Sequence, residues 1–329
     1  MDLSKILIAF GISLILSLTL TPLTAVLARR WRVIDRPREE RWNEEGKPRL
    51  GGLGIFAGFI GALSLIKGVR DEVLIIVAFA SFILLIGLLD DKYGTKPLFK
   101  FIAQLIAAGG TMALGVRMKI TPAYLAIPVT ALWLIGLTNA MNLLDNMDGL
   151  AGGVSALIAG GIAIMTCKHP LIPAVAAAVA GGCLGFLVYN FNPSKLFMGD
   201  CGALFLGYTL SALAIEGFWK KSSPWFPSLL VPFFIFSVPI FDTTLVTVSR
   251  LKSKIAPWHG GKDHSSHRLV TLGLSERKAV LVLYSLTALG CLTAFAVLSL
   301  PPKWVPGLAS PLAIIMILMG WRLLRTGSR

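Results

Sequence analysis

NAMNLLDNMDGLAGG, at residues 139–153, lies between two apolar segments at 122–138 and 154–165. Polar side chains between two membrane-length apolar runs are costly to keep unless they serve a function. Four of them recur at intervals of three and would lie roughly on one face of a helical turn: Asn139, Asn142, Asp145 and Asp148. Oxygen ligands of this kind suit a hard cation such as Mg²⁺. A short polar turn between two helices is the alternative interpretation.

The composition of the chain indicates a membrane protein. Of its 329 residues 55% are hydrophobic and 15% are charged, whereas about a quarter of a soluble domain is charged. The net charge of +14 fits anionic lipid or phosphorylated substrates, and no nucleic-acid-binding motif accompanies it. The four cysteines are scattered without CxxC pairs, which indicates neither a disulfide framework nor a zinc site.

Apolar runs of about 17 to 24 residues predict eleven transmembrane helices in one all-α, polytopic domain spanning residues 1–329. The predicted spans are 6–28, 51–66, 72–89, 97–116, 122–144, 149–166, 170–189, 202–218, 227–249, 279–300 and 306–321. The first is too long for a signal-peptide core and is predicted to be a retained anchor. Lys and Arg concentrate after odd-numbered spans, so the positive-inside rule places the N-terminus outside and the C-terminus in the cytoplasm.

Most of the unusual polar residues fall in five loops on the predicted cytoplasmic side. These loops cover about 29–50, 90–100, 139–153, 190–202 and 250–278. Asp90 and Asp91 are adjacent, and because neighbouring carboxylates repel each other, either a nearby cation or a raised pKa on one of them is expected. An ordinary acidic pair at a helix end is the alternative. Asp200 lies at the start of the eighth span, where it is a helix cap, a metal ligand or both.

The last of these loops contains PWHGGKDHSSHRL, at residues 257–269, with three of the four histidines of the chain. His264 and His267 lie among basic residues, a composition that favours phosphate capture over a zinc site, although the HxxH spacing is weak support for either. Asp242 lies about two helical turns from Arg250, which places it about 10 Å below the membrane surface. We expect this acid to line a polar cavity.

Acidic and basic groups together on one membrane face favour an enzyme that transfers a phosphate-linked group. Acids gather divalent cations and basic groups gather phosphates, so a pyrophosphate bridged by Mg²⁺ would suit both. A site at the lipid boundary would make one phosphorylated reactant a lipid. The alternative from another class is a transporter of an anionic solute, which would place polar residues through several spans; the second, sixth, seventh and tenth spans carry almost none.

The chain resembles the polyprenyl-phosphate N-acetylhexosamine-1-phosphate transferases, glycosyltransferase family 4. The likeness runs from about residue 35 to 274, with the family motifs in the same order. They are an Asp-x-Pro loop ending in Pro-x-x-Gly-Gly, LLDD followed by a Lys, NxxNxxDxxDGLA, FMGDxG and a last loop with His. Eleven spans are similar to the bacterial members that act on UDP-N-acetylglucosamine. The muramoyl-pentapeptide branch typically has ten spans and a triple-His loop.

This resemblance implies a membrane enzyme of cell-envelope glycan synthesis. A sugar 1-phosphate, expected to be N-acetylglucosamine 1-phosphate, would pass from a UDP-sugar to undecaprenyl phosphate at the cytoplasmic face of the inner membrane. UMP and the first lipid-linked intermediate would be the products, and Mg²⁺, or alternatively Mn²⁺, would be required. Phospho-MurNAc-pentapeptide transfer is the alternative within the family. The donor sugar, the final polymer and a homodimer stay open.

The resemblance also implies roles for individual residues. Asp200 corresponds to the metal-binding aspartate and Asn142 to a metal-proximal asparagine. Asp90 and Asp91 correspond to the catalytic pair, with Asp90 as the expected base toward the lipid phosphate. The positions that would hold the nucleotide sugar are Lys100, Asn190, Asp145 and Asp148. The positions that would grip the sugar or the diphosphate are His264, His267 and Arg268.

Two loops depart from the common family pattern. In the first loop Asn43 and Glu40 stand where many members carry His and Arg, which leaves the role of that loop open. In the last loop the histidines of DHSSHRL are separated by two serines, whereas many relatives carry adjacent histidines. This second departure leaves the donor sugar less defined.

Overall fold

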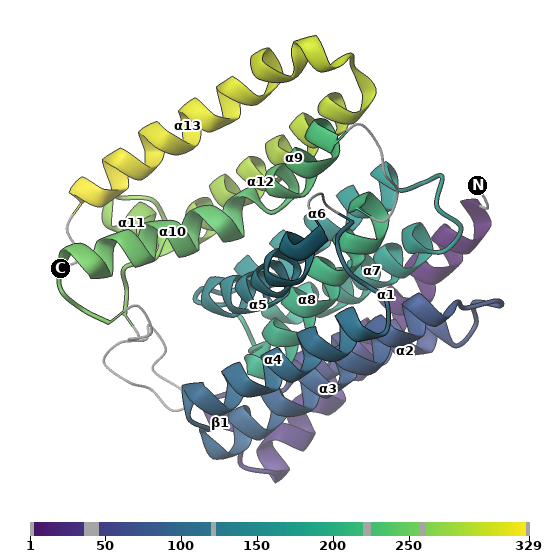
Figure 1. Cartoon of the computed structure of the whole chain (residues 1–329). Coiled ribbons are helices and arrows are strands. Elements are labelled where there is room, and N and C mark those ends of the chain that lie inside the picture. Colours follow the sequence, from purple (N-terminus) through teal and green to yellow (C-terminus); the bar gives the residue numbers. More distant parts are fainter. Residues whose placement is uncertain (1–2, 36–45, 120–122, 220–224, 257–260, 327–329) are drawn as a thin grey trace.

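The computed structural model describes residues 3–35, 46–119, 123–219, 225–256 and 261–326, which form a bundle of helices (Figure 1). The α-helices are α1 (Leu3–Arg30), α2 (Gly51–Leu63), α3 (Asp71–Tyr93), α4 (Pro97–Ala113), α5 (Ala126–Leu144), α6 (Leu150–Met165), α7 (Ile172–Asn190), α8 (Gly199–Ala214), α9 (Trp225–Ile235), α10 (Ser237–Lys252), α11 (Ser265–Thr271), α12 (Glu276–Ser299) and α13 (Val305–Arg325). Shorter elements are the 3-10 turns η1 (Ala123–Leu125) and η3 (Pro302–Trp304), a π-helical turn η2 (Ile215–Trp219), and the strands β1 (Ile34–Asp35) and β2 (Lys47–Pro48).

Many of these helices are suited to a membrane, which confirms the prediction of a helical polytopic membrane protein. Within the described residues, seven are long and apolar enough to cross a bilayer, namely α1, α3, α5, α7, α8 with η2, α12 and α13. Helices α2, α4 and α6 are shorter and also apolar. The predicted ninth span is divided into α9 and α10 at Phe236. Pro232 and Pro239 flank this break, and proline has no N–H to donate to a continuous helix.

Helix α8 is the centre of the bundle. Every residue from Cys201 to Ala214 is buried, and α2, α3 and α5 contact this helix. Because the hydrophobic effect does not drive helices together inside a bilayer, close van der Waals contact must hold them. Glycines supply that contact here. A Cβ on Gly52 would lie 2.2 Å from the Cα of Gly202, and one on Gly87 would lie 2.5 Å from the Cα of Cys201.

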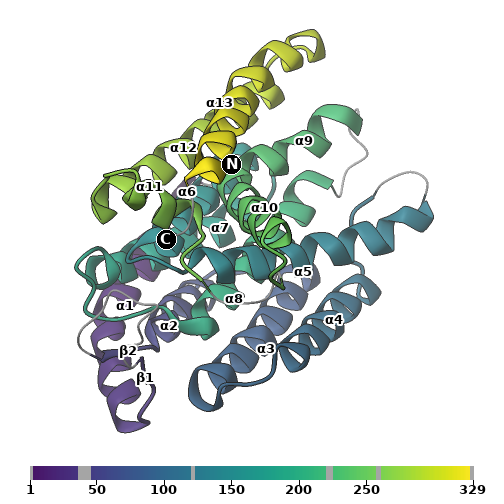
Figure 2. The same cartoon turned by 90° about the vertical axis from the view of Figure 1, so that its left-hand side faces the viewer.

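The periphery of the bundle has the opposite character. Helix α13 is mostly exposed, since only 11% of the residues in its most apolar 18-residue stretch are buried. Its exposed side chains include Ile314, Ile317 and Leu318. Large apolar residues on an outer helix fit contact with lipid chains. The two ends of the chain lie at opposite ends of the bundle (Figure 1). The end that carries the C-terminus also carries β1, β2 and α11, as the turned view shows (Figure 2).

The short strands β1 and β2 are the one departure from an all-helical chain within the described residues. They pair antiparallel, with Ile34 opposite Pro48 and Asp35 opposite Lys47. Beyond β2 the chain joins the segment before α8, since the Phe197 N–H donates to the Pro48 carbonyl at 2.8 Å and the Gly51 N–H donates to the Phe197 carbonyl at 2.9 Å. The first and fourth predicted loops are thereby joined. Asn43 and Glu40 lie outside the described residues.

The contact at Gly87 gives a test of this packing. Replacing Gly87 by Ala places a methyl group against the α8 backbone, and we expect a loss of about 1–3 kcal/mol in the free energy of unfolding. The measurement is the apparent melting temperature of the purified protein in detergent. Gly109→Ala is the matched control, because Gly109 is also helical and no atom lies within 4 Å of the added Cβ. Equal melting temperatures for the two variants would show that α3 and α8 are not in close contact.

Candidate active site

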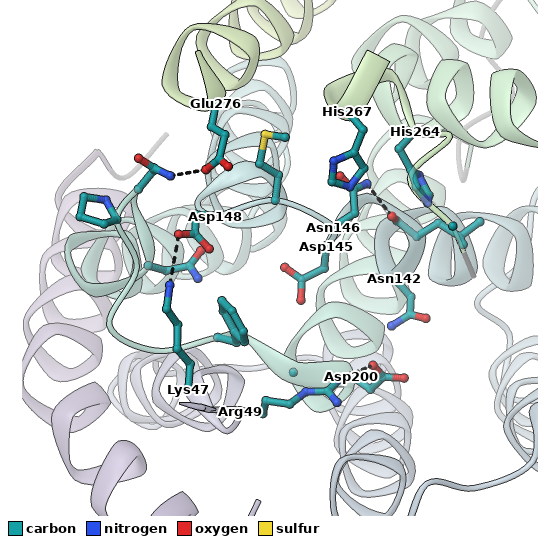
Figure 3. Close-up of a pocket in the computed structure, with 18 residues that line it drawn as sticks. Lys47, Arg49, Asn142, Asp145, Asn146, Asp148, Asp200, His264, His267 and Glu276 are labelled. Atoms are coloured by element: carbon teal, nitrogen blue, oxygen red, sulfur yellow. Dashed lines mark hydrogen bonds and ion pairs between the residues drawn. The ribbon is translucent and has the colours of Figure 1, made fainter. Parts of the chain in front are cut away.

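A polar cavity of about 470 Å³ opens among the predicted loops (Figure 3). It is lined by Lys47, Arg49, Asn142, Leu143, Asp145, Asn146, Met147, Asp148, Asn190, Asn192, Pro193, Phe197, Gly199, Asp200, Gly261, His264, His267 and Glu276. Four of the five predicted loops thus contribute side chains directly. The remaining loop, at residues 90–100, reaches the cavity through contacts with Asp200.

The stretch at residues 139–153 bends around the cavity instead of continuing as one helix. Helix α5 ends at Leu144, and Gly149, with a φ of 82°, turns the chain into α6. This positive φ is unfavourable for residues with a Cβ. Asn142, Asp145 and Asp148 line the cavity as the spacing predicts.

Asn139, the fourth polar residue of that spacing, lies one turn deeper and serves helix packing. Its amide nitrogen donates to the side chain of Gln104 in α4 at 2.6 Å and to the Ile135 carbonyl at 2.8 Å. Of the four polar residues at this spacing, three therefore line the cavity, and Asn139 forms a hydrogen bond between helices.

Asn190 and Asp148 hold the walls of the cavity as well as lining it. Asn190 accepts a hydrogen bond from the Gly149 N–H at 3.0 Å and donates to the Leu196 carbonyl at 2.9 Å. Asp148 accepts from the Ser194 N–H at 2.9 Å, and its carboxylate lies 3.7 Å from the Lys47 ammonium group. Lys47 was not singled out from the sequence.

Asp90 and Asp200 share the ammonium group of Lys100. The Lys100 nitrogen lies 2.8 Å from Asp90 Oδ2 and 2.9 Å from Asp200 Oδ2, which joins α3, α4 and α8. The local sequence makes this possible, since Gly94 ends α3 with a φ of 65° and Pro97 begins α4. The turn also brings the Thr95 N–H to Asp90 Oδ1 at 2.8 Å.

Asp91, next to Asp90, is used differently. Its side chain is fully buried, and its two oxygens accept hydrogen bonds from the backbone N–H groups of Asp200 and Cys201, both at 2.9 Å. The first turn of a helix has N–H groups without partners in the helix, and Asp91 supplies acceptors for two of them in α8. Asp91 is absent from the cavity lining, and its geometry is that of a residue that fixes the position of Asp200.

Arg49 is a cavity residue that sequence analysis missed. Its guanidinium group lies 3.5 Å from Asp35, 3.6 Å from Asp91 and 3.5 Å from Asp200. Burial alone would lower the pKa of Arg49, but the negative charges of Asp91 and Asp200 outweigh it and raise that pKa above its ordinary value. The available signal was its position in the Pro-x-x-Gly-Gly motif, two residues before the glycine pair that begins α2.

The two predicted histidines lie on the cavity wall opposite Asp148. His264 Nδ1 lies 2.8 Å from Asp242 Oδ2. His267 is buried, and its Nδ1 has no hydrogen-bond partner among the described residues. Burial lowers the pKa of His267 to about 4, so its ring is neutral at pH 7. A buried ring nitrogen beside the cavity is thus available to a ligand.

Arg268 and Asp242 lie behind the cavity wall instead of lining it. The Arg268 guanidinium group donates to the carbonyls of Asp263, Leu323 and Thr326, which ties the last loop to the end of α13. The expectation that Asp242 lines a polar cavity is not met, because its carboxylate is occupied by the start of α11. Both residues hold the loop that carries the histidines.

The donor set fits a magnesium ion that is shared with a substrate. In the described part of the chain, no group of three or more His, Cys, Asp or Glu is arranged to hold a metal by itself. Mg²⁺ usually takes one or two carboxylates together with substrate phosphates and water, so a closed protein cage is not required. Asp200 and Asn142 offer hard oxygen donors to one cavity. Lys100 and Arg49 compensate the negative charge of Asp200 there.

The sequences of several known proteins align with most of this chain. A family model described as glycosyl transferase family 4 matches residues 73–218. A probable undecaprenyl-phosphate N-acetylglucosaminyl 1-phosphate transferase of Bacillus subtilis is 37% identical, over 85% of this chain and 81% of the relative. A decaprenyl-phosphate N-acetylglucosaminephosphotransferase of Mycolicibacterium smegmatis is 31% identical, over 92% and 84%. A phospho-N-acetylmuramoyl-pentapeptide-transferase of Synechococcus sp. is 31% identical, over 87% and 90%.

The geometry of Asp91 gives a second test. Asparagine has one acceptor oxygen, so Asp91→Asn leaves one buried N–H of α8 unpaired, at a cost of about 1–3 kcal/mol. We expect the apparent melting temperature and the turnover to fall together. Asp71→Asn, at the exposed opposite end of α3, is the control and should change neither. Loss of turnover at an unchanged melting temperature would instead assign Asp91 to the chemistry alone.

Proposed function

The chain belongs to glycosyl transferase family 4, and on that premise we propose that it transfers N-acetylglucosamine 1-phosphate from UDP-N-acetylglucosamine to undecaprenyl phosphate. An oxygen of the lipid phosphate attacks the sugar-bearing phosphorus, a new P–O–P bond forms, and the old one breaks to release UMP. The observation that carries the proposal is the single cavity in which Asp200, Asn142 and Arg49 meet at the end of a membrane helix bundle.

Charge neutralisation is the main task of such a site. A phosphate that approaches a diphosphate is repelled, because both groups are negatively charged. Arg49 and Lys100 lie beside Asp200 and supply positive charge from fixed positions. Preorganised charges of this kind cost little reorganisation during the reaction. In this proposal they hold the two phosphate groups at reacting distance.

The remaining side chains take the parts of the substrates that fit their chemistry. Asp90 is the base that receives any proton on the lipid phosphate. Asp145, Asp148 and Asn190 form the wall that holds the nucleotide sugar, and His264 and His267 grip it from the opposite wall (Figure 3). Asp91 and Arg268 act by holding backbone in place.

Mg²⁺ is the cofactor that this site would use. When bound by Asp200 and Asn142, it would supply positive charge to the diphosphate and orient it. Mn²⁺ has similar coordination preferences and is a practical probe for the same position.

We propose that the chain crosses the inner membrane eleven times, with the N-terminus outside and the cavity in the cytoplasm. The cavity loops lie at the same end of the bundle as the C-terminus, and the N-terminus lies at the other end (Figure 1). The predicted loops after odd-numbered spans, which carry most of the Lys and Arg residues, are assigned to the same end as the C-terminus. A cytoplasmic cavity gives access to a nucleotide sugar, and the apolar flanks of the bundle give access to a lipid.

Turnover by the purified protein tests the proposed reaction. Protein in detergent is incubated with UDP-N-acetylglucosamine, undecaprenyl phosphate and Mg²⁺, and the release of UMP is followed. UMP is expected only when all three are present. A parallel reaction with UDP-MurNAc-pentapeptide tests the alternative branch, and release of UMP from that donor alone would replace the acetylglucosamine assignment.

Asp200→Asn tests the metal position. We expect a decrease in turnover of about 10²–10³-fold, comparable to the loss of one preorganised charge-stabilising group. Mn²⁺ affinity, measured by electron paramagnetic resonance, should decrease at least about tenfold. Asp71→Asn should leave both unchanged. Unchanged Mn²⁺ affinity in Asp200→Asn would remove Asp200 from the metal site.

A further inference from the structure

Asp242 is a buried acid in α10 whose carboxylate is entirely engaged by the last loop. Only 1% of the residue is exposed. Its Oδ2 lies 2.8 Å from His264 Nδ1, and its Oδ1 accepts from the backbone N–H of Ser265 at 2.7 Å and from the Ser265 hydroxyl at 2.6 Å. A buried carboxylate is costly unless it is paired. Within the described residues, the hydrogen bonds of the Asp242 carboxylate all go to two adjacent residues of this loop, His264 and Ser265.

These hydrogen bonds determine which nitrogen of His264 carries a proton. An ionised carboxylate can only accept, so the facing His264 Nδ1 must be protonated. The other ring nitrogen, Nε2, is then the one left for a ligand, and His264 lines the cavity. In a neutral ring Nε2 accepts a hydrogen bond, and in a charged ring it donates one.

The surrounding contacts keep the neighbouring carboxylate from competing for His264. Asp263 is paired with Arg250, with Nε at 2.8 Å from one oxygen and Nη2 at 2.8 Å from the other. Arg268 binds the Asp263 carbonyl at 2.8 Å and also reaches the end of α13. The backbone before and after His264 is thereby held, and Asp242 is left as the carboxylate that contacts the ring.

We propose that Asp242 is a positioning residue that holds His264 with Nδ1 protonated and Nε2 directed at the nucleotide sugar. The identity of this ligand rests on the proposed function, whereas the protonation of Nδ1 does not. The contacts with His264 and Ser265 give a reason for a charged group in the mostly apolar first half of α10. A residue that only braced the loop would need no particular arrangement of the His264 protons.

Asp242→Asn separates the two roles. The Ser265 N–H needs an acceptor, so the asparagine oxygen stays with Ser265 and its NH₂ group faces His264 Nδ1. That NH₂ group donates, which forces the proton of the imidazole from Nδ1 to Nε2. Asp242→Asn therefore inverts the tautomer while it keeps the size of the side chain and the contact with Ser265.

Nitrogen-15 NMR of histidine-labelled protein measures this directly. The chain contains four histidines, and the spectrum of His264→Gln identifies the signals of His264 by their loss. We expect a protonated Nδ1 in the unmodified protein and an Nε2–H tautomer in Asp242→Asn. An unprotonated Nδ1 of His264 in the unmodified protein overturns the proposal even if Asp242→Asn fails to fold. An unchanged tautomer in a folded Asp242→Asn variant overturns it too.

Kinetics provide the functional arm of the test. We expect kcat/KM for the nucleotide sugar to decrease about 10–100-fold in Asp242→Asn, because the His264 ring would then present the wrong hydrogen-bonding group to the ligand. In a His264→Gln background the same substitution should have little further effect. Additive losses in the double variant would assign Asp242 a structural role only.

Thr244→Ala is the matched control, since Thr244 lies two residues away on the exposed side of α10. It should change neither the tautomer nor kcat/KM. If the unmodified protein releases no UMP from any nucleotide sugar, the proposed function fails. The NMR result would still decide whether Asp242 fixes the His264 ring.

Discussion

The ion pairs of Lys100 with Asp90 and Asp200 are the interactions on which the rest of the site depends. The ammonium group of Lys100 lies within 2.9 Å of both carboxylates. The two acids, Asp90 in α3 and Asp200 in α8, are 110 residues apart in the sequence. Without this positive charge, two acids at the end of a membrane bundle would repel each other and would be costly to bury. The same arrangement leaves Asp200 facing the cavity, where a metal ion and a diphosphate could share it.

Close helix packing makes these ion pairs possible. Gly87 allows α3 to approach the start of α8, and Gly52 and Gly202 allow α2 and α8 to cross at short distance. Asp91 then caps α8 from α3. The location of Asp200 is thus set by backbone contacts and by a buried hydrogen-bonding acid. A change in helix packing should therefore be transmitted to the cavity even though Gly52, Gly87 and Gly202 do not line it.

The polar residues divide into those that line the cavity and those that hold its backbone. Asp145, Asp200 and His264 belong to the first group. Asp91, Asp242 and Arg268 belong to the second, and each of them engages backbone N–H or carbonyl groups near the end of a helix. A loop at a membrane surface has few apolar contacts to stabilise it, so buried hydrogen bonds take over that task. This division explains why several charged side chains near the cavity, such as Asp91, Asp242 and Arg268, are buried.

The sequence by itself determined the helical membrane class, the positions of most helices and the loops that carry the site, because apolar run length and local polarity report how each segment meets its solvent. Tertiary structure alone separated Asp90 from Asp91, moved Asn139, Asp242 and Arg268 out of the cavity lining, and brought Arg49 into it. The reason is physical. The partner of a polar side chain is chosen by contacts between distant segments, such as Asp91 with the start of α8, and local periodicity carries no information about them.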